Sequence, residues 1–223
     1  MYLLVTLGQM LVIFGIAPAV IIFGVAGRWD LWNVWAYVGV FVAVWSFQAL
    51  ALYRVSPGLL KERLKPSNAG RQPLAAIGGV ASFIVYWGIA GLDLRFHWSN
   101  IFPPAAIIAG LVLVAVGLGL VTWSMLVNSF FSSAVRIQED RGQTVISAGP
   151  YGIVRHPGYV GGILAFLASG LALNSLLLII PAVILSVVFV NRTAIEDRML
   201  QGELAGYAEY VGKVRYRLLP GIW

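Results

Sequence analysis

The sequence predicts an all-α integral membrane protein, a bundle of five to six transmembrane helices with a cytosolic C-terminal helix and tail. The first observation is composition: 60% of the 223 residues are hydrophobic and 11% are charged, whereas soluble domains carry about 25% charged residues. The second is patterning, because the charges gather in a few segments and leave uncharged runs of about 20 residues or more, enough to cross a bilayer. The size suits a single membrane domain over residues 1–223.

The first half of the chain predicts four spans. Its uncharged runs cover residues 1–27, 31–53, 72–92 and 103–127. The first run has no basic segment before it and is longer than the apolar core of a signal peptide, so we expect it to be retained as a span. Between the second and third runs, prolines and a glycine in the basic segment 54–71 predict a short amphipathic helix followed by a loop.

The second half contains one further uncharged run, residues 157–191. This run is long for one helix and barely long enough for two. Asn174-Ser175 and Pro181 fall inside it, which favours a tight helical hairpin. Residues 192–223 are polar, and we expect them to begin as a helix and to end as an extended basic tail.

The distribution of basic residues predicts the orientation in the membrane. Lys and Arg number five after the second run, three between the fourth and fifth runs, and five after Asn191, together thirteen of the fifteen in the chain. Six crossings with both ends in the cytosol place all thirteen on the cytoplasmic side of a bacterial plasma membrane or endoplasmic reticulum. Five crossings would break this pattern. The same clustering accounts for the net charge of +6 without a nucleic-acid partner.

The segment Gly149–Gly162, GPYGIVRHPGYVGG, is the most constrained polar stretch of the chain. Gly149-Pro150 marks a turn. Pro157 disfavours a helical conformation at His156 and makes it extended. Glycines among its last residues allow close approach by a ligand or a neighbouring helix. We therefore expect a structured loop at the membrane surface that holds a site.

A second polar segment, NRTAIEDRML, follows the last uncharged run. Arg192 and Glu196 are four residues apart and so share one helix face, at the level where water, lipid and protein meet. The alternative is an ordinary surface ion pair, which would stabilise the helix by roughly 0.2–0.5 kcal/mol. The chain has no cysteine, and no His, Asp or Glu residues have metal-ligand spacing, so we expect no metal site.

These segments together resemble a known family. GPY-x3-RHP-x-Y-x-G, followed about 30 residues later by R-T-x2-E-[DE]-x2-L, is specific in combination, and GYAEY and VRYRLLPGIW extend the likeness to the end of the chain. Residues 129–223 closely resemble the isoprenylcysteine carboxyl methyltransferase-like family, which is related to the phospholipid methyltransferases. Upstream, SPGLLKERLKP is similar to the family as well.

The resemblance implies a membrane enzyme that uses S-adenosylmethionine, with four spans in residues 1–127 and a cofactor-binding half in 128–223. Its methyl acceptor would be lipophilic: a prenylated protein cysteine, an isoprenoid acid or thiol, or a phospholipid amine. Arg192 matches an arginine on the acceptor side, and with Glu196 it would be catalytic. The positions that match the family's cofactor contacts are Arg136, Gln143, Thr144, Val145, Ile146, Tyr151, His156, Pro157, Gly158, Tyr159 and Glu196.

These residue types suit that chemistry. A carboxylate such as Glu196 can accept hydrogen bonds from the cofactor's ammonium or ribose, and Tyr151 or Tyr159 can stack on adenine or face the sulfonium. Arg192 can orient a carboxylate acceptor through a bidentate pair. An amine acceptor would instead need Glu196 or His156 to remove a proton.

Other functions remain open at this point. One is a phospholipid or amine N-methyltransferase. Another is a nicotinamide-dependent membrane reductase, since membrane sterol reductases share a similar C-terminal pocket but are usually larger. A non-enzymatic membrane protein is the third, although the sequence places no charged residue clearly at mid-membrane. Binding of S-adenosylmethionine separates a methyltransferase from the reductase and the non-enzymatic protein.

Overall fold

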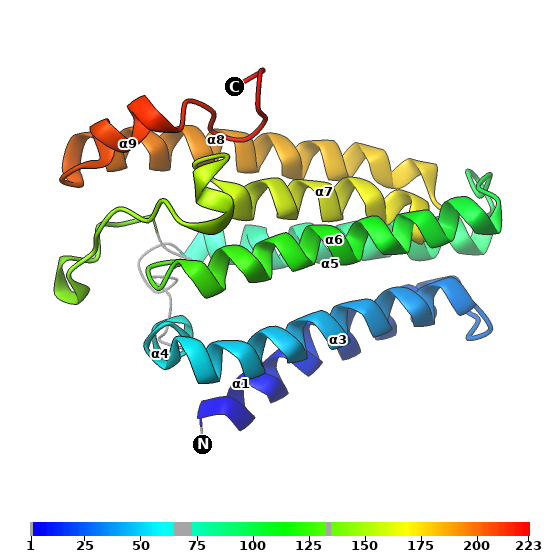
Figure 1. The fold of residues 1–223 in the computed structure, drawn as a ribbon. Helices are drawn as coiled ribbons and strands as arrows, with labels where there is room; N and C mark the ends of the chain where they lie inside the picture. The colour runs from blue at the N-terminus through cyan, green and yellow to red at the C-terminus, as the bar shows by residue number, and fades with distance from the viewer. Residues whose placement is uncertain (1, 65–72, 133–134) are drawn as a thin grey trace.

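The computed structural model describes residues 2–64, 73–132 and 135–223, and in these residues it contains helices and loops but no strand. The long helices lie side by side, and the short helices α4 and α9 lie at the same end of the bundle, on opposite sides of it (Figure 1). The helices are α1 (Tyr2–Leu11), α2 (Ala17–Ala26), α3 (Trp32–Val55), α4 (Pro57–Leu64), α5 (Pro73–Phe96), α6 (Pro104–Val127), α7 (Pro157–Ala172), α8 (Ile179–Glu203) and α9 (Tyr207–Lys213).

Several helices have the length and apolar composition of membrane spans. Within the described residues these are Tyr2–Ala26, Trp32–Val55, Pro104–Val127 and Leu176–Glu203, with α7 as a shorter apolar helix. The first span contains a π-helical turn, η1 (Val12–Ile16), which joins α1 to α2. α5 has 24 residues and packs against α2. The multi-pass membrane architecture is thus confirmed, whereas the six crossings and their orientation stay predictions.

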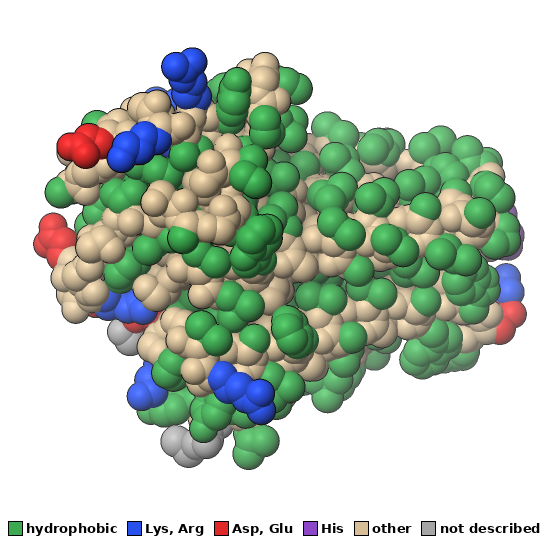
Figure 2. Space-filling view, in the orientation of Figure 1, with side chains coloured by type: hydrophobic (Ala, Val, Ile, Leu, Met, Phe, Trp, Pro, Cys, Tyr) green, Lys and Arg blue, Asp and Glu red, His purple; other side chains and the backbone are tan. Residues whose placement is uncertain are grey.

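The surface agrees with this architecture. Hydrophobic side chains cover most of the length of the bundle, and Lys, Arg, Asp and Glu gather at the end that carries α4 and α9 (Figure 2). The short amphipathic helix expected within residues 54–71 is α4; the loop expected after it lies outside the described residues. The charged end of the bundle is therefore where a water-soluble ligand can reach the protein.

The expected helical hairpin is formed by α7 and α8. Asn174 adopts a left-handed conformation with φ 52°, and the Ser175 backbone N–H donates to the Gly170 carbonyl at 2.8 Å. A 3₁₀ turn, η5 (Leu176–Leu178), then leads into α8. The fully buried Asp93 of α5 accepts a hydrogen bond from the Ser175 hydroxyl and so attaches the hairpin turn to the neighbouring helix. α8 continues without a break from its apolar half into the polar segment that carries Arg192 and Glu196.

α6 and α7 make the most extensive helix contact in the bundle. A Cβ atom built on Gly117 would lie 2.6 Å from the Gly161 carbonyl oxygen, and one built on Gly161 would overlap the Gly117 carbonyl. The absence of side chains at both positions lets the two backbones touch, as is common where membrane helices pack closely. This contact fixes the start of α7, and with it the loop that precedes it.

Candidate functional site

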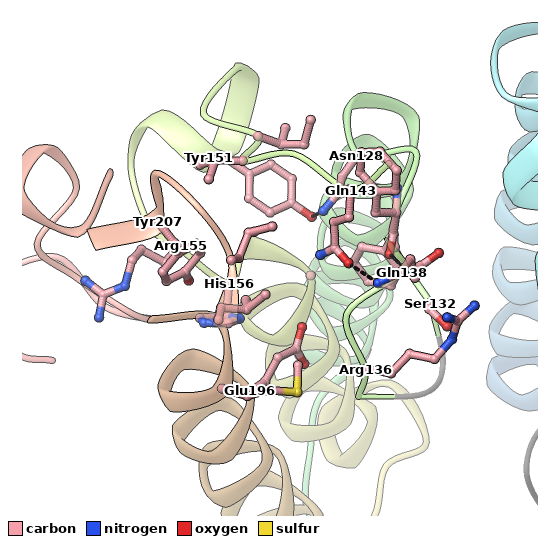
Figure 3. Close-up of a pocket in the computed structure, with 18 of the residues that line it drawn as sticks. Asn128, Ser132, Arg136, Gln138, Gln143, Tyr151, Arg155, His156, Glu196 and Tyr207 are labelled. Carbon is pink, nitrogen blue, oxygen red and sulfur yellow. Dashed lines mark hydrogen bonds between the residues drawn. The ribbon is translucent and has the colours of Figure 1, made fainter. Parts of the chain in front are cut away.

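A cavity of about 260 Å³ lies at the charged end of the bundle, between the loop that follows α6, the start of α7, the end of α8 and α9 (Figure 3). The twelve residues expected from the sequence to form the site come from three separate segments, and eleven of them line this cavity: Arg136, Gln143, Thr144, Val145, Ile146, Tyr151, His156, Gly158, Tyr159, Arg192 and Glu196. The twelfth, Pro157, is buried in the first turn of α7 instead.

The loop before α7 has the shape expected from its prolines and glycines. Gly149 has φ 57° and begins a 3₁₀ turn, η4 (Gly149–Gly152). His156 has φ −129° and ψ 60°, so α7 begins at Pro157. The backbone N–H groups of Arg155 and His156 donate to the carbonyls of Tyr216 and Arg217 at 2.9 and 3.0 Å. The C-terminal tail is therefore part of the framework that holds the loop.

Asp197, at the end of α8, connects the loop to the tail. Its side chain is fully buried and accepts two hydrogen bonds from Arg155, Nε to Oδ1 at 2.7 Å and Nη2 to Oδ2 at 2.9 Å. Arg217 Nε donates to Oδ2 at 2.7 Å, and the Tyr207 hydroxyl donates to Oδ1 at 3.0 Å. His156 Nε2 lies 3.2 Å from Oδ1. Burial alone would lower the pKa of Arg155, but the hydrogen bond and charge of Asp197 raise it above its ordinary value.

Arg192 and Glu196 lie on the same face of α8, as their spacing predicts, and the Tyr159 hydroxyl of α7 joins them. This hydroxyl donates to Glu196 Oε2 at 2.6 Å and accepts from Arg192 Nε at 2.8 Å. All three side chains face the cavity. The pair is therefore built into the wall of a site rather than being an ordinary surface pair.

Tyr151 is held firmly at the other side of the cavity. It is buried, its hydroxyl accepts a hydrogen bond from Asn128 Nδ2 at 3.2 Å, and its carbonyl accepts one from the Tyr210 hydroxyl at 2.7 Å. Burial raises the pKa of Tyr151 well above the usual value for a phenol. Tyr151 therefore offers a neutral aromatic surface with a fixed position.

The segment between α6 and η4 forms a third wall and is attached to α4. Arg136 pairs with Asp140 at 2.8 Å and with Glu62 of α4 at 3.0 Å, and these two hydrogen bonds raise the pKa of Arg136. The Gln143 side chain accepts a hydrogen bond from the Gln138 backbone N–H at 2.7 Å (Figure 3). Gln143 therefore stabilises the conformation of this wall and also lines the cavity.

Sequence reasoning missed other lining residues, which come from distant parts of the chain. Tyr207 and Tyr210 are the clearest cases: their rings pack edge to face with centroids 5.4 Å apart. Their spacing of three in GYAEY places them on one helix face, a signal that could have found them. Arg155 also lines the cavity, as its place in the loop before Pro157 suggested. The other lining residues not expected were Arg63, Asn128, Phe130, Phe131, Ser132, Gln138, Phe189, Met199, Leu200 and Leu204.

Comparison with known families bears on this region. Residues 105–205 match the family model described as phospholipid methyltransferase. The matched residues make up a little under half of the chain. The matched stretch runs from α6 through the loop and α7 to the end of α8, and so includes most of the residues that line the cavity.

Most of the chain is also similar to a solved structure. It is similar to a eukaryotic intramembrane Ras methyltransferase, isoprenylcysteine carboxyl methyltransferase, with 21% sequence identity and a TM-score of 0.49. The match covers 92% of this chain and 73% of that one. A search of curated proteins found no match to the sequence. Of the lining residues, Arg63, Tyr207 and Tyr210 lie outside the stretch 105–205 that matches the family model.

Proposed function

We propose that the cavity binds S-adenosylmethionine and that its methyl group is transferred to a lipophilic acceptor, in the first place an isoprenylcysteine carboxylate or a similar lipid acid. The observation that carries this proposal is the convergence of Glu196, Tyr151, Tyr159 and residues 143–146 on one cavity, all of them within the stretch that matches the phospholipid methyltransferase model. The cavity lies at the charged end of an apolar bundle, where a water-soluble cofactor and a lipid can both arrive (Figure 2).

The lining fits the cofactor. Glu196 supplies an anion for its ammonium or ribose hydroxyls, and Tyr151 and Tyr159 supply aromatic faces for its adenine or sulfonium. Gly158 lets the Phe131 ring of the cavity wall pack directly against the start of α7, since a Cβ atom there would lie 2.5 Å from that ring. When bound, S-adenosylmethionine supplies the methyl group as an electrophile, so the protein's task is to bind and align.

Alignment falls to residues held by hydrogen bonds. Tyr159 fixes Arg192 and Glu196 relative to each other. Arg192 orients the acceptor carboxylate, and Glu196 holds the cofactor. Phe131 and Phe189 exclude water from the cavity between them. A carboxylate acceptor needs no general base. Positioning of the reactants alone can lower an activation barrier by up to about 7–11 kcal/mol.

The charges of the lining favour an anionic acceptor. Arg63, Arg136, Arg155 and Arg192 line the cavity, and Glu196 is the acidic residue among its described walls. Arg136 and Arg155 are paired with acids, whereas Arg63 forms no ion pair with an acid of the described residues. A carboxylate or phosphate would be attracted to Arg63, whereas a protonated amine would be repelled.

A second candidate is methyl transfer to a phospholipid amine. The description of the matched family favours it, and a phospholipid carries a phosphate that the arginines can attract. In this reaction Glu196 or His156 would take the proton from the amine. Both groups line the cavity.

The test is transfer of radiolabelled methyl from S-adenosylmethionine, measured with purified protein in lipid nanodiscs. N-acetyl-S-farnesylcysteine and phosphatidylethanolamine are offered in parallel. The primary proposal expects labelled ester from the first; labelled N-methyl lipid from the second alone would replace it by the second candidate. Absence of transfer to both, together with no binding of S-adenosylhomocysteine, would contradict both and direct attention to a reductase or a non-enzymatic role.

A further inference from the structure

Arg63 of α4 lies between two cavities. Its side chain lines the central cavity described above and also a second cavity, of about 230 Å³, bounded by α1, α3 and α4. Neither the family match nor the sequence motifs give this residue a role. Its position makes it the one described side chain that the two cavities have in common.

α4 is fixed against both regions. Leu59 and Leu60 are buried and pack with Leu52 and Met125, while Glu62 pairs with Arg136 of the cavity wall at 3.0 Å. α4 therefore cannot rotate freely, and Arg63 is held pointing between the cavities rather than into solvent.

The charge of Arg63 is poorly satisfied by the protein. Its hydrogen bond to the Phe131 carbonyl is long, 3.4 Å from Nη1. All nine Asp and Glu residues of the chain fall in the described ranges, and none of them forms an ion pair with Arg63. Burial lowers the pKa of Arg63, which shows that its surroundings disfavour the cation. Such a charge is costly to keep unless an anion accompanies it.

The second cavity is mainly apolar but contains an unsatisfied polar group. Gln48 is only 2% exposed, and its Oε1 has no hydrogen-bond partner within the described ranges. Its Nε2 lies against Met125 Sδ, so one end of the amide lacks a partner whichever way it is turned. The apolar walls come from Met10, Ile13, Phe14, Ala49, Leu52, Leu60 and Leu64.

We propose that Arg63 binds the anionic group of the lipid acceptor together with Arg192, which lines the same central cavity, and that the cavity between α1, α3 and α4 receives part of the acceptor's apolar chain. That the bound lipid is the methyl acceptor rests on the proposed function. The lipid-binding site itself depends only on Arg63 and the second cavity. The anion is a carboxylate or a phosphate, because a guanidinium pairs with both in the same geometry. Gln48 can accept a hydrogen bond from an amide or hydroxyl of the same lipid.

The experiment measures lipid binding without turnover, by titration of the full-length protein in detergent. N-acetyl-S-farnesylcysteine is compared with its methyl ester, and dioleoyl phosphatidic acid with dioleoylglycerol, so that each pair differs in charge. The variants are Arg63→Gln, Arg63→Lys and, as a matched control, Arg54→Gln, which removes an exposed arginine nearby on α3. Binding of S-adenosylhomocysteine is measured on each sample.

The wild type is expected to bind at least one acid more tightly than its neutral counterpart. Arg63→Gln is expected to weaken binding of that acid about tenfold or more and to leave the neutral lipid unchanged, since one charge-assisted hydrogen bond is lost. Arg63→Lys recovers part of the loss, and Arg54→Gln has no effect. The lipid pair whose difference in affinity is lost in Arg63→Gln identifies the bound anion as a carboxylate or a phosphate.

The second cavity is tested by Ala49→Phe, which places a ring in it. Ala49 is 2% exposed and lines this cavity, away from the central one. The substitution is expected to weaken the binding of charged and neutral lipids alike, whereas Arg63→Gln weakens the binding of charged lipids only. Equal binding of acid and neutral lipid by the wild type, or an unchanged ratio in Arg63→Gln, overturns the inference. Failure to bind S-adenosylhomocysteine with the lipid pattern intact would instead overturn the cofactor assignment alone.

Discussion

Arg155 and Asp197 form a bidentate ion pair inside the protein, with Nε–Oδ1 and Nη2–Oδ2 distances of 2.7 and 2.9 Å. The two residues are 42 positions apart in the chain. The pair joins the loop before α7 to the end of α8, and Arg217 adds the tail to the same carboxylate. The position of the cavity walls relative to one another therefore depends on one buried acid that does not itself line the cavity.

Replacement of Asp197 by Asn is expected to destabilise this end of the protein. It leaves two arginines without their carboxylate, and breaking a buried ion pair costs about 3–5 kcal/mol. We expect a lower thermal transition in detergent and at least tenfold weaker binding of S-adenosylhomocysteine. Glu203→Gln, at an exposed position six residues further along α8, is the control and should change neither. Wild-type affinity in Asp197→Asn would show that the loop is held without this ion pair.

Removal of the Tyr159 hydroxyl tests the connection between Arg192 and Glu196. Tyr159→Phe keeps the ring and loses both hydrogen bonds. We expect kcat to fall about tenfold or more, because Arg192 is released from its orientation, with a smaller change in S-adenosylhomocysteine affinity. Steady-state kinetics with saturating cofactor measure this; an unchanged kcat would remove Tyr159 from the alignment of the site.

Helix α9 is expected to support Tyr151 through Tyr210. Tyr210→Phe removes the donor to the Tyr151 carbonyl and leaves a buried acceptor unpaired, which typically costs about 1–3 kcal/mol. S-adenosylhomocysteine affinity and thermal stability should both fall. Tyr216→Phe, at a partly exposed position of the tail, is the control. If the two variants behave alike, the hydrogen bond of Tyr210 has no special role.

The contact of α6 with α7 should not tolerate a side chain. Gly161→Leu forces the helices apart, and overpacking of this kind costs about 1–3 kcal/mol or more. Gly119→Leu is the matched control on α6, since a Cβ atom there meets open space. Thermal unfolding of both variants in detergent measures the difference; equal stability would contradict the close packing.

The sequence predicted those parts of the site that depend on local chemistry. Pro157 restricts the residue before it, so the extended His156 and the start of α7 could be expected from their order alone. The spacing of Arg192 and Glu196 likewise placed them on one face of α8. The hairpin followed from the length of an uncharged run with Asn174 near its middle.

Contacts between distant segments were beyond this reasoning. The sequence contains Tyr159, Arg192 and Glu196, but no local rule places a hydroxyl of α7 between two side chains of α8. Asp197 entered the sequence motif only as its [DE] position, and its burial under the loop and tail arises from packing. The same holds for Arg63, whose helix could be predicted but whose place between two cavities depends on how α4 docks against α3 and α6.

The central claim is that the cavity is a cofactor site, and calorimetric titration of S-adenosylhomocysteine into the purified protein tests it most directly. Wild type and Glu203→Gln are expected to bind with micromolar affinity. Glu196→Gln and Tyr151→Ala should bind at least tenfold more weakly, because they remove an anion and an aromatic face from the cavity wall. A folded wild type that does not bind, or equal affinity in all four proteins, would contradict the account.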